Sequence, residues 1–271
     1  MTDLTLVRLP TDMEKLVRWA GERGWTGGAG PRGGGRFDEG RALHHLLDES
    51  FGPGEFRPFR LLVPPRRMSG NLYAYTRQPV DALIRRAQEV APPEHLDVLD
   101  LDGLTGKPMP TRFEAGRRLG FDLRVRPVRR RRAPLGETPP PVEKGTQTRH
   151  REVDAFLAEA TNAHADDPEG MAGAGRSREA VYLDWLAERL DGAAALERAT
   201  SHLAKFQRLR VARARKGGKP VEGPDAVIHG TLTVTDPAAF AGLLASGVGR
   251  HKAYGFGMLL LRPPNAAIPT A

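Results

Sequence analysis

The sequence predicts an α+β protein made of two tandem units, each with the order strand, helix, strand, strand, helix, strand. Two observations support this prediction. Apolar residues with strand and helix periods recur in the same order in both halves, and a length of 271 residues suits two domains of ordinary size. This order is the split βαβ arrangement of ferredoxin-like, or RRM-like, domains. We place the two domains at residues 1–112 and 113–271.

The first unit begins with a predicted strand over residues 4–9, followed by a helix. Thr11 and Glu14 have the spacing of a capping box, which marks a helix start. The glycine-rich stretch 24–35 has too little apolar surface to order itself, so we predict a flexible insertion. A second helix runs over residues 38–51, from an aspartate N-cap to a Gly-Pro stop.

This second helix carries two adjacent histidines in different positions. At about 100° per residue, its leucines form one apolar face, His44 lies on the border of that face, and His45 points nearly opposite. A border histidine can be held by packing while its ring tip lies in a groove, which suits a general acid or base. Arg41 and Asp48 flank it at i−3 and i+4, so they could neutralise a phosphate and orient the imidazole. The alternative is a histidine that a helix edge half-covers.

The rest of the first unit contains three more strand candidates and a helix. Short apolar runs at residues 56–63 and 72–75 indicate a hairpin. Residues 79–90 have helical spacing, and 96–101, after two prolines, fit a weaker final strand.

The second unit opens with a strand at residues 119–125, in which apolar and polar side chains alternate. Arg124 on its polar face and Arg126 just beyond it are expected to contact phosphate. A run of four arginines follows, and we add Arg129 and Arg130 to this candidate RNA-binding surface. The alternative for the run is a solvated linker. The later residues predict two helices, over 153–160 and 181–190, and a strand over 227–235. A helix over 236–246 and a final strand over 258–261 complete the unit.

Residues 202–219 form the most basic stretch of the chain and contain no acid. With a strand over 203–214 and a turn at Gly217-Gly218, the stretch would be a basic hairpin that probes an RNA groove. Helical spacing fits the same residues, which leaves a basic helix as the alternative. The candidate RNA contacts in this stretch are Arg208, Arg210, Arg213, Arg215 and Lys216.

Residues 247–261 join a glycine-rich loop to the final apolar strand. Glycines allow positive φ and close backbone approach, and three cationic side chains lie between them, so we interpret the loop as an anion site. The loop has no Gly-Lys-Ser/Thr, which argues against a nucleotide-binding loop. The alternative is a glycine-rich turn packed under its own domain. The candidate RNA-binding residues here are Gly249, Arg250, His251, Lys252, Gly255 and Gly257.

Composition narrows the function further. The chain has 41 Lys and Arg against 33 Asp and Glu, a net charge of +8, which favours a polyanion such as nucleic acid as partner. It has no cysteine, and its eight histidines show no metal-ligand spacing, so we expect no metal and no cofactor. No apolar run approaches the roughly 20 residues that span a bilayer. We therefore expect a soluble, cytoplasmic protein without membrane association.

Three segments resemble one known family in the same order along the chain. They are Leu43-His44 in the early helix, R-V-R-P at residues 124–127, and the tail G-V-G-R-H-K-A-Y-G-F-G-M-L-L that starts at Gly247. With them the chain resembles a CasE-type CRISPR-associated endoribonuclease, the crRNA-processing subunit of type I-E Cascade in the RAMP superfamily. Relatives often have a tyrosine three residues before the catalytic histidine, and this chain has Arg41 there.

The resemblance implies two ferredoxin-like domains that bind a CRISPR repeat hairpin and cleave pre-crRNA at its 3′ base without a metal. It also implies that the protein keeps the crRNA and joins the other Cascade subunits. The family's catalytic histidine falls on His44. Cleavage would use the RNA 2′-OH and leave a 2′,3′-cyclic phosphate and a 5′-hydroxyl. A histidine exchanges protons near neutral pH, so His44 would be the general acid or the general base, and Arg41 would stabilise the phosphorane.

Two other functions fit part of the pattern. A non-catalytic RNA-hairpin-binding module would share the charge and the fold but would not need a histidine facing a groove. A nucleotide-binding enzyme would use the glycine loop and magnesium, and the missing Lys-Ser/Thr argues against it.

Overall fold

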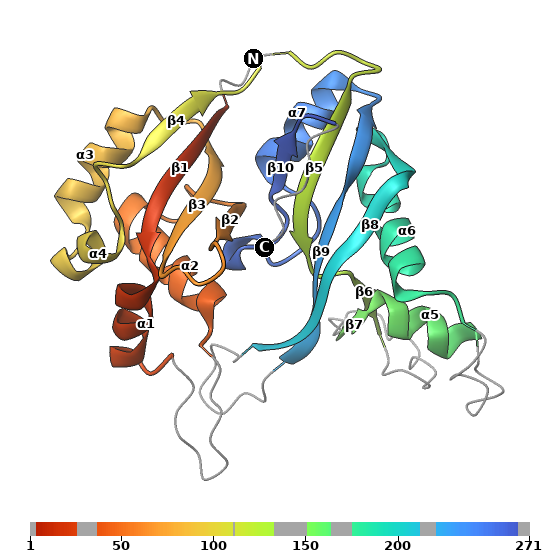
Figure 1. Cartoon of the computed structure of the whole chain (residues 1–271), viewed down its shortest axis with the longest axis horizontal. Coiled ribbons are helices and arrows are strands. Elements are labelled where there is room, and N and C mark those ends of the chain that lie inside the picture. The colour runs from red at the N-terminus through yellow and green to blue at the C-terminus, as the bar shows by residue number, and fades with distance from the viewer. Residues whose placement is uncertain are drawn as a thin grey trace, which may run out of the picture.

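The computed structural model describes residues 4–25, 37–110, 112–132, 151–163, 175–211 and 221–264. Two four-stranded antiparallel sheets lie side by side (Figure 1). The first sheet has the order β2-β3-β1-β4 and consists of β1 Thr5–Asp12, β2 Phe59–Leu62, β3 Ser69–Thr76 and β4 Thr105–Pro108. The second has the order β10-β5-β9-β8 and consists of β5 Arg118–Val125, β8 Ala194–Val211, β9 Val221–Val234 and β10 Leu259–Arg262.

Counted within its own unit, each sheet has the spatial order second, third, first, fourth strand. This is the ferredoxin-like order, and the predicted fold class is confirmed. The first unit carries the helices α1 Met13–Glu22, α2 Glu39–Phe51, α3 Val80–Val90 and α4 Pro93–Val98. The second carries α5 Ala155–Ala163, α6 Arg178–Leu190, α7 Pro237–Ser246, the 3₁₀ turn η2 Lys252–Tyr254, and the small hairpin of β6 Val128–Arg131 with β7 Arg151–Asp154. In Figure 1, α3 and α4 lie at one outer flank and α6 at the other.

Each sheet buries an apolar core against its own helices. In the first unit, Leu43 and Leu46 of α2 are fully buried together with Leu72 of β3. In the second, Trp185 of α6 is 1% exposed and packs with Phe121 of β5. Each such side chain contributes roughly 1.5–3 kcal/mol through removal from water, so α2 and α6 are held firmly on their sheets.

The two units also contact each other directly. Tyr75 of β3 lies in the core of the second unit, and its hydroxyl donates to the Leu259 carbonyl oxygen at 2.9 Å. Nearby, the Arg60 guanidinium of β2 lies 3.4 Å from the Asp122 carboxylate of β5. These contacts bring β2 and β3 against β5 and β10.

Two local predictions for the first unit are wrong, namely the final strand at residues 96–101 and the helix start at Thr11. Residues 96–101 are not a strand, because Pro93 starts the helix α4 at its first position, where a proline needs no N–H partner. The final strand is β4, and all four of its residues are exposed, so no apolar pattern marks it in the sequence. The helix α1 is capped by Asp12, whose carboxylate accepts from the Lys15 amide, while Thr11 is buried in β1.

Up to Val211, the basic stretch is a strand rather than a helix: β8 pairs with β9 from Ala194 to Val211, with register shifts between Glu197 and His202 and between Leu203 and Lys205. The predicted turn at residues 217–218 and most of the insertion at 24–35 lie outside the described residues. Within the described ranges, no helix is long and apolar enough to cross a bilayer.

Candidate active site and nucleic-acid surface

The helix α2 places His44 at the rim of the first core. The Asp38 carboxylate accepts from the Arg41 amide at 3.1 Å and starts the helix, and the buried leucines fix its rotation. The His44 side chain is 20% exposed, and that of His45 is 38% exposed. His44 is therefore held by packing and keeps part of its ring open.

Two charged side chains contact the His44 ring. Its Nδ1 lies 3.4 Å from an Arg57 guanidinium nitrogen and 3.5 Å from a carboxylate oxygen of Asp48. Arg57 also donates to Asp48, and Asp48 accepts from the Gly54 amide at 3.2 Å. Asp48 thus ties the chain before β2 to α2 and fixes Arg57 beside the imidazole.

The surroundings of His44 favour its neutral form. Burial lowers the pKa of His44 most, and the charges of Arg57 and His45 lower it further, while Asp48 opposes them and raises it. The net pKa lies below the ordinary value of 6.5. His44 is therefore mainly neutral at pH 7.

The glycine-rich loop of the second unit reaches this site. The centroid of the Tyr254 ring, at the end of η2, lies 5.1 Å from that of His44, with the rings at 65°. The loop is fixed from the other side because the Glu152 carboxylate of β7 binds both His251, at 2.6 Å, and Arg250. The hydrogen bond from His251 is the largest of the effects that lower the pKa of Glu152 to about 2. The loop therefore bridges β7 and α2.

The structure gives each predicted loop glycine a packing reason. All have positive φ, and a Cβ at Gly249 would lie 2.9 Å from the Trp185 ring. A Cβ at Gly255 would lie 3.0 Å from the Phe59 ring, and one at Gly257 would lie 2.4 Å from the Val248 oxygen. Lys252 is half-buried, and burial lowers its pKa. RNA binding by these residues stays a prediction, as it does for Arg250 and His251.

Arg41 turns toward a different partner from the one expected. Its guanidinium lies 5.0 Å from the centre of the Trp25 ring, and Trp25 stacks on His45 at 4.6 Å. The cation that contacts His44 is Arg57. Sequence reasoning did not include Arg57 or Tyr254, because they lie 13 and 210 positions from His44 and no helical spacing connects them.

Two predicted RNA-binding arginines are buried where the units meet. Arg124 donates to both Asp225 oxygens at 2.9 Å and to Glu39 of α2 at 3.2 Å, and its side chain is 14% exposed. Arg126 is 3% exposed and lies over the Phe256 ring, 5.9 Å from its centre. Arg124 therefore links the two units, whereas Arg126 packs within its own unit, and contact of either residue with RNA stays a prediction.

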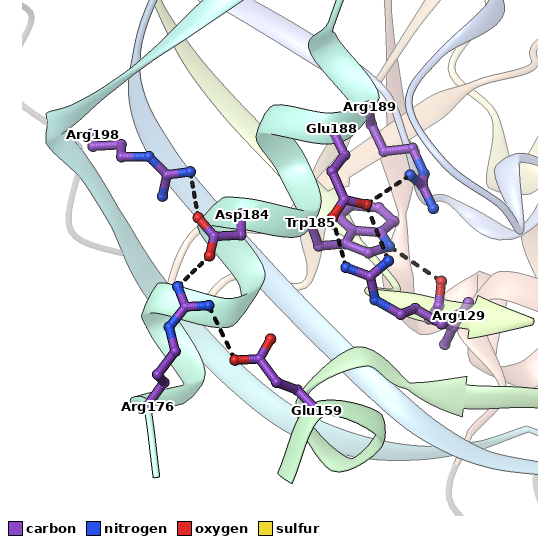
Figure 2. Close-up of polar contacts among 9 residues, drawn as sticks. Arg129, Glu159, Arg176, Asp184, Trp185, Glu188, Arg189 and Arg198 are labelled. Atoms are coloured by element: carbon purple, nitrogen blue, oxygen red, sulfur yellow. Dashed lines mark hydrogen bonds and ion pairs between the residues drawn. The ribbon is translucent and has the colours of Figure 1, made fainter. Parts of the chain in front are cut away.

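The arginine run lies partly on the outer face of α6. Figure 2 shows Arg129 of β6 paired with Glu188, at 2.7 and 3.2 Å, beside Arg189. Farther along α6, Asp184 lies between Arg176 and Arg198. The Trp185 indole N–H donates to the Val128 carbonyl oxygen at 3.2 Å and fixes β6 on the helix.

Two of the remaining predicted contacts are exposed in the second unit. Arg130 is exposed, and Arg208 of β8 is exposed and donates to Glu222 of β9 at 2.8 Å. Arg210 lies in β8 near its end. Three further candidates lie outside the described residues, namely Arg213, Arg215 and Lys216. Among the described residues, no three His, Asp or Glu side chains group as metal ligands.

The chain is thus an α+β protein of two tandem ferredoxin-like units, in which a helix histidine of the first unit faces a glycine-rich loop of the second. A family model then gives the particular family: "CRISPR associated protein" matches residues 28–263, most of the chain. The chain belongs to this CRISPR-associated family, and the family expected from the sequence is confirmed. No curated protein matches the chain.

Solved structures share the fold. One is Thermus thermophilus Cse3 bound to an RNA representing a pre-cleavage complex, with 18% identity over 96% of this chain and 100% of that chain, and a TM-score of 0.59. Another is the CRISPR-associated protein Cas6e from Escherichia coli str. K-12, with 17% identity over 96% of this chain and 99% of that chain, and a TM-score of 0.52. At these identities, the likeness shows the tandem fold.

Proposed function

We propose that this protein is a metal-independent endoribonuclease that binds the CRISPR repeat hairpin and cleaves pre-crRNA at the 3′ base of the hairpin. The observation that carries the proposal is the partly exposed setting of His44, near Arg57 of the first unit and the glycine-rich loop of the second. Membership of the CRISPR-associated family supports it. A structure with the same fold is described as CRISPR endoribonuclease Cse3 bound to 19 nt RNA.

In the proposed reaction, the RNA 2′-oxygen attacks the adjacent phosphorus and the bond to the 5′-oxygen breaks. The products are a 2′,3′-cyclic phosphate and a 5′-hydroxyl. Within the described ranges, Nδ1 makes the polar contacts of His44, so Nε2 is left to exchange a proton with the RNA, as general base for the 2′-OH or general acid for the leaving oxygen.

The phosphorane carries an additional negative charge that a fixed cation would stabilise. Arg57 lies closest to the reacting imidazole and is 36% exposed, so a phosphate at His44 can reach it. Arg41, the residue expected from the sequence, would instead contact the RNA farther along α2, beside Trp25.

Binding would come from the cationic residues of the second unit through phosphate contacts, with the shape of the hairpin giving specificity. Retention of the crRNA and entry into Cascade with its other subunits complete the proposal, as the family resemblance implies. The net charge of +8 supports a nucleic-acid partner.

The test is a digest of repeat hairpin RNA in EDTA, followed by mass analysis of the ends. We expect one cut at the 3′ base of the hairpin, with a cyclic phosphate and a 5′-hydroxyl. A substrate with a single 2′-deoxy nucleotide at the cut should bind and stay intact. Binding without cleavage of the all-ribose RNA would identify the protein as a non-catalytic hairpin-binding module, and cleavage that requires a metal would refute the mechanism.

A further inference from the structure

The His44 ring lies near two other rings. The His45 ring is 5.0 Å away on the same helix, tilted by 43°, and the Tyr254 ring is 5.1 Å away at 65°. The pair with Tyr254 has the favourable edge-to-face arrangement of aromatic rings. The α2 helix thus supplies one of the rings beside His44, and the loop supplies the other.

The position of Tyr254 is determined by its own loop. His251 and Gly255, on either side of η2, have the left-handed φ values of 63° and 80°. The Tyr254 amide donates to the His251 carbonyl oxygen at 2.9 Å, and the His251 ring is bonded to Glu152 at 2.6 Å. The ring therefore starts from an anchored turn rather than from a free loop.

A glycine of α2 makes the approach of Tyr254 possible. A Cβ at Gly40 would lie 2.8 Å from the Tyr254 carbonyl oxygen and 3.1 Å from the Tyr254 Cβ. The first distance is shorter than any ordinary contact, so any larger residue at position 40 would push the loop away from the helix. The sequence of α2 and the conformation of the loop are thus matched to each other.

We propose that Tyr254 is a positioning residue that holds the His44 imidazole in one orientation and excludes water from one side of it. The ring of Tyr254 does this, rather than its hydroxyl. Only the expected effect of Tyr254 on the cleavage rate rests on the proposed function; its effect on the His44 ring does not. The other groups that face His44 are Asp48, Arg57 and His45, and none of them lies on the loop.

The first test observes His44 in the free protein without RNA. A histidine NMR titration compares wild type, Y254F and Y254A. We expect Y254F to titrate like wild type because the ring remains, and Y254A to titrate nearer to 6.5 because water reaches the imidazole. G40A should shift the titration in the same direction, although it leaves the tyrosine chemically intact. Y254A and wild type with the same titration would overturn the proposal.

The second test is single-turnover cleavage of the repeat hairpin. We expect Y254A to cleave about 10- to 100-fold more slowly, since displacement of a reacting group by about 1 Å has that effect. Y254F should stay close to wild type, and hairpin affinity should not change. A loss in Y254F equal to that in Y254A would assign the effect to the hydroxyl and refute positioning by the ring.

The two tests separate this proposal from the proposed function. If no variant and no wild-type protein cleaves RNA while Y254A still shifts the titration of His44, the nuclease function is wrong and the enclosure by Tyr254 stands. If wild type cleaves and the titration is unaffected by Y254A and G40A, the nuclease function stands and the role of Tyr254 is wrong.

Discussion

The helices α2 and α6 occupy the same place in their units, since each precedes the second strand of its sheet, yet their charged groups are arranged differently. Along α6, two acids each lie between two arginines: Asp184 between Arg176 and Arg198, and Glu188 between Arg129 and Arg189 (Figure 2). Along α2, a partly exposed imidazole is kept mainly neutral. The acids and arginines of α6 pair with each other, so they leave little charge free to bind a ligand. The neutral imidazole of α2 can accept or donate a proton.

The largest effect should come from His44 itself. H44A should lower the cleavage rate about a hundredfold to ten-thousandfold, the usual contribution of general acid–base catalysis, and hairpin affinity should persist. Single-turnover cleavage and a filter-binding titration measure the two quantities. The matched control on α6 is D184N, which should cleave normally. An H44A protein that cleaves at the wild-type rate would contradict the assignment of catalysis to α2.

The next effect concerns the two arginines near α2. R57A should lower the cleavage rate by roughly a hundredfold, because loss of one preorganised group at a developing oxyanion has this size. R41A should have a clearly smaller effect, since the Arg41 guanidinium lies over Trp25. Parallel rate measurements decide between them. A larger loss in R41A would return the phosphorane-stabilising role to the residue expected from the sequence.

A binding effect should appear in the second unit. Replacing Arg208, Arg210 and Arg213 together by alanine should weaken hairpin binding about tenfold and reduce the salt dependence of the affinity, with up to about one unit of slope lost per phosphate contact. The cleavage rate of bound RNA should change much less. If the triple variant binds normally and cleaves slowly, the division into a catalytic first unit and a binding second unit is wrong.

The smallest effect is a shift in pH dependence. The pKa of His44 is lowered, so one limb of the profile of kcat/KM, which reports on the free enzyme, should have its midpoint below 6.5. Activity falls below that midpoint if His44 is the base and above it if His44 is the acid. The Asp48 charge raises the pKa, so D48N should move the midpoint lower still. A midpoint above 6.5 in wild type would contradict a lowered pKa of His44.

The lowered pKa has a consequence for stability that follows from linkage. Below pH 6.5, the unfolded chain protonates this histidine more readily than the folded protein does, so His44 destabilises the fold as the pH falls through that value toward its folded pKa. Above pH 6.5, both states are neutral and the contribution disappears. H44Q should therefore flatten the stability profile in the weakly acidic range.

The sequence predicts elements well where burial imposes a period. The alternation over β5 and the leucine face of α2 are predicted correctly because each has one face that is more deeply buried than the other. The prediction failed at β4, which is wholly exposed and has no such pattern. It also failed at α4, where an apolar run after two prolines suited either a strand or a short helix.

The site could be predicted only as far as local spacing reaches. His44 and Asp48 are one helical turn apart and were found together, whereas Arg57 and Tyr254 come to His44 through the packing of other elements. Arginine was interpreted as a phosphate ligand wherever it clustered. The acids that pair with Arg124 and Arg129, Asp225 and Glu188, lie far along the chain, so the pairing was not visible.

The bridge between the glycine-rich loop and α2 affects when the site can form during synthesis. The ribosome makes His44 early and completes its helix long before Tyr254 and β10 emerge, and domains generally fold in the order in which they are made. A growing chain would therefore display a folded first unit whose imidazole has no loop beside it. For the proposed nuclease, cleavage would reach its full rate only after the second sheet has formed.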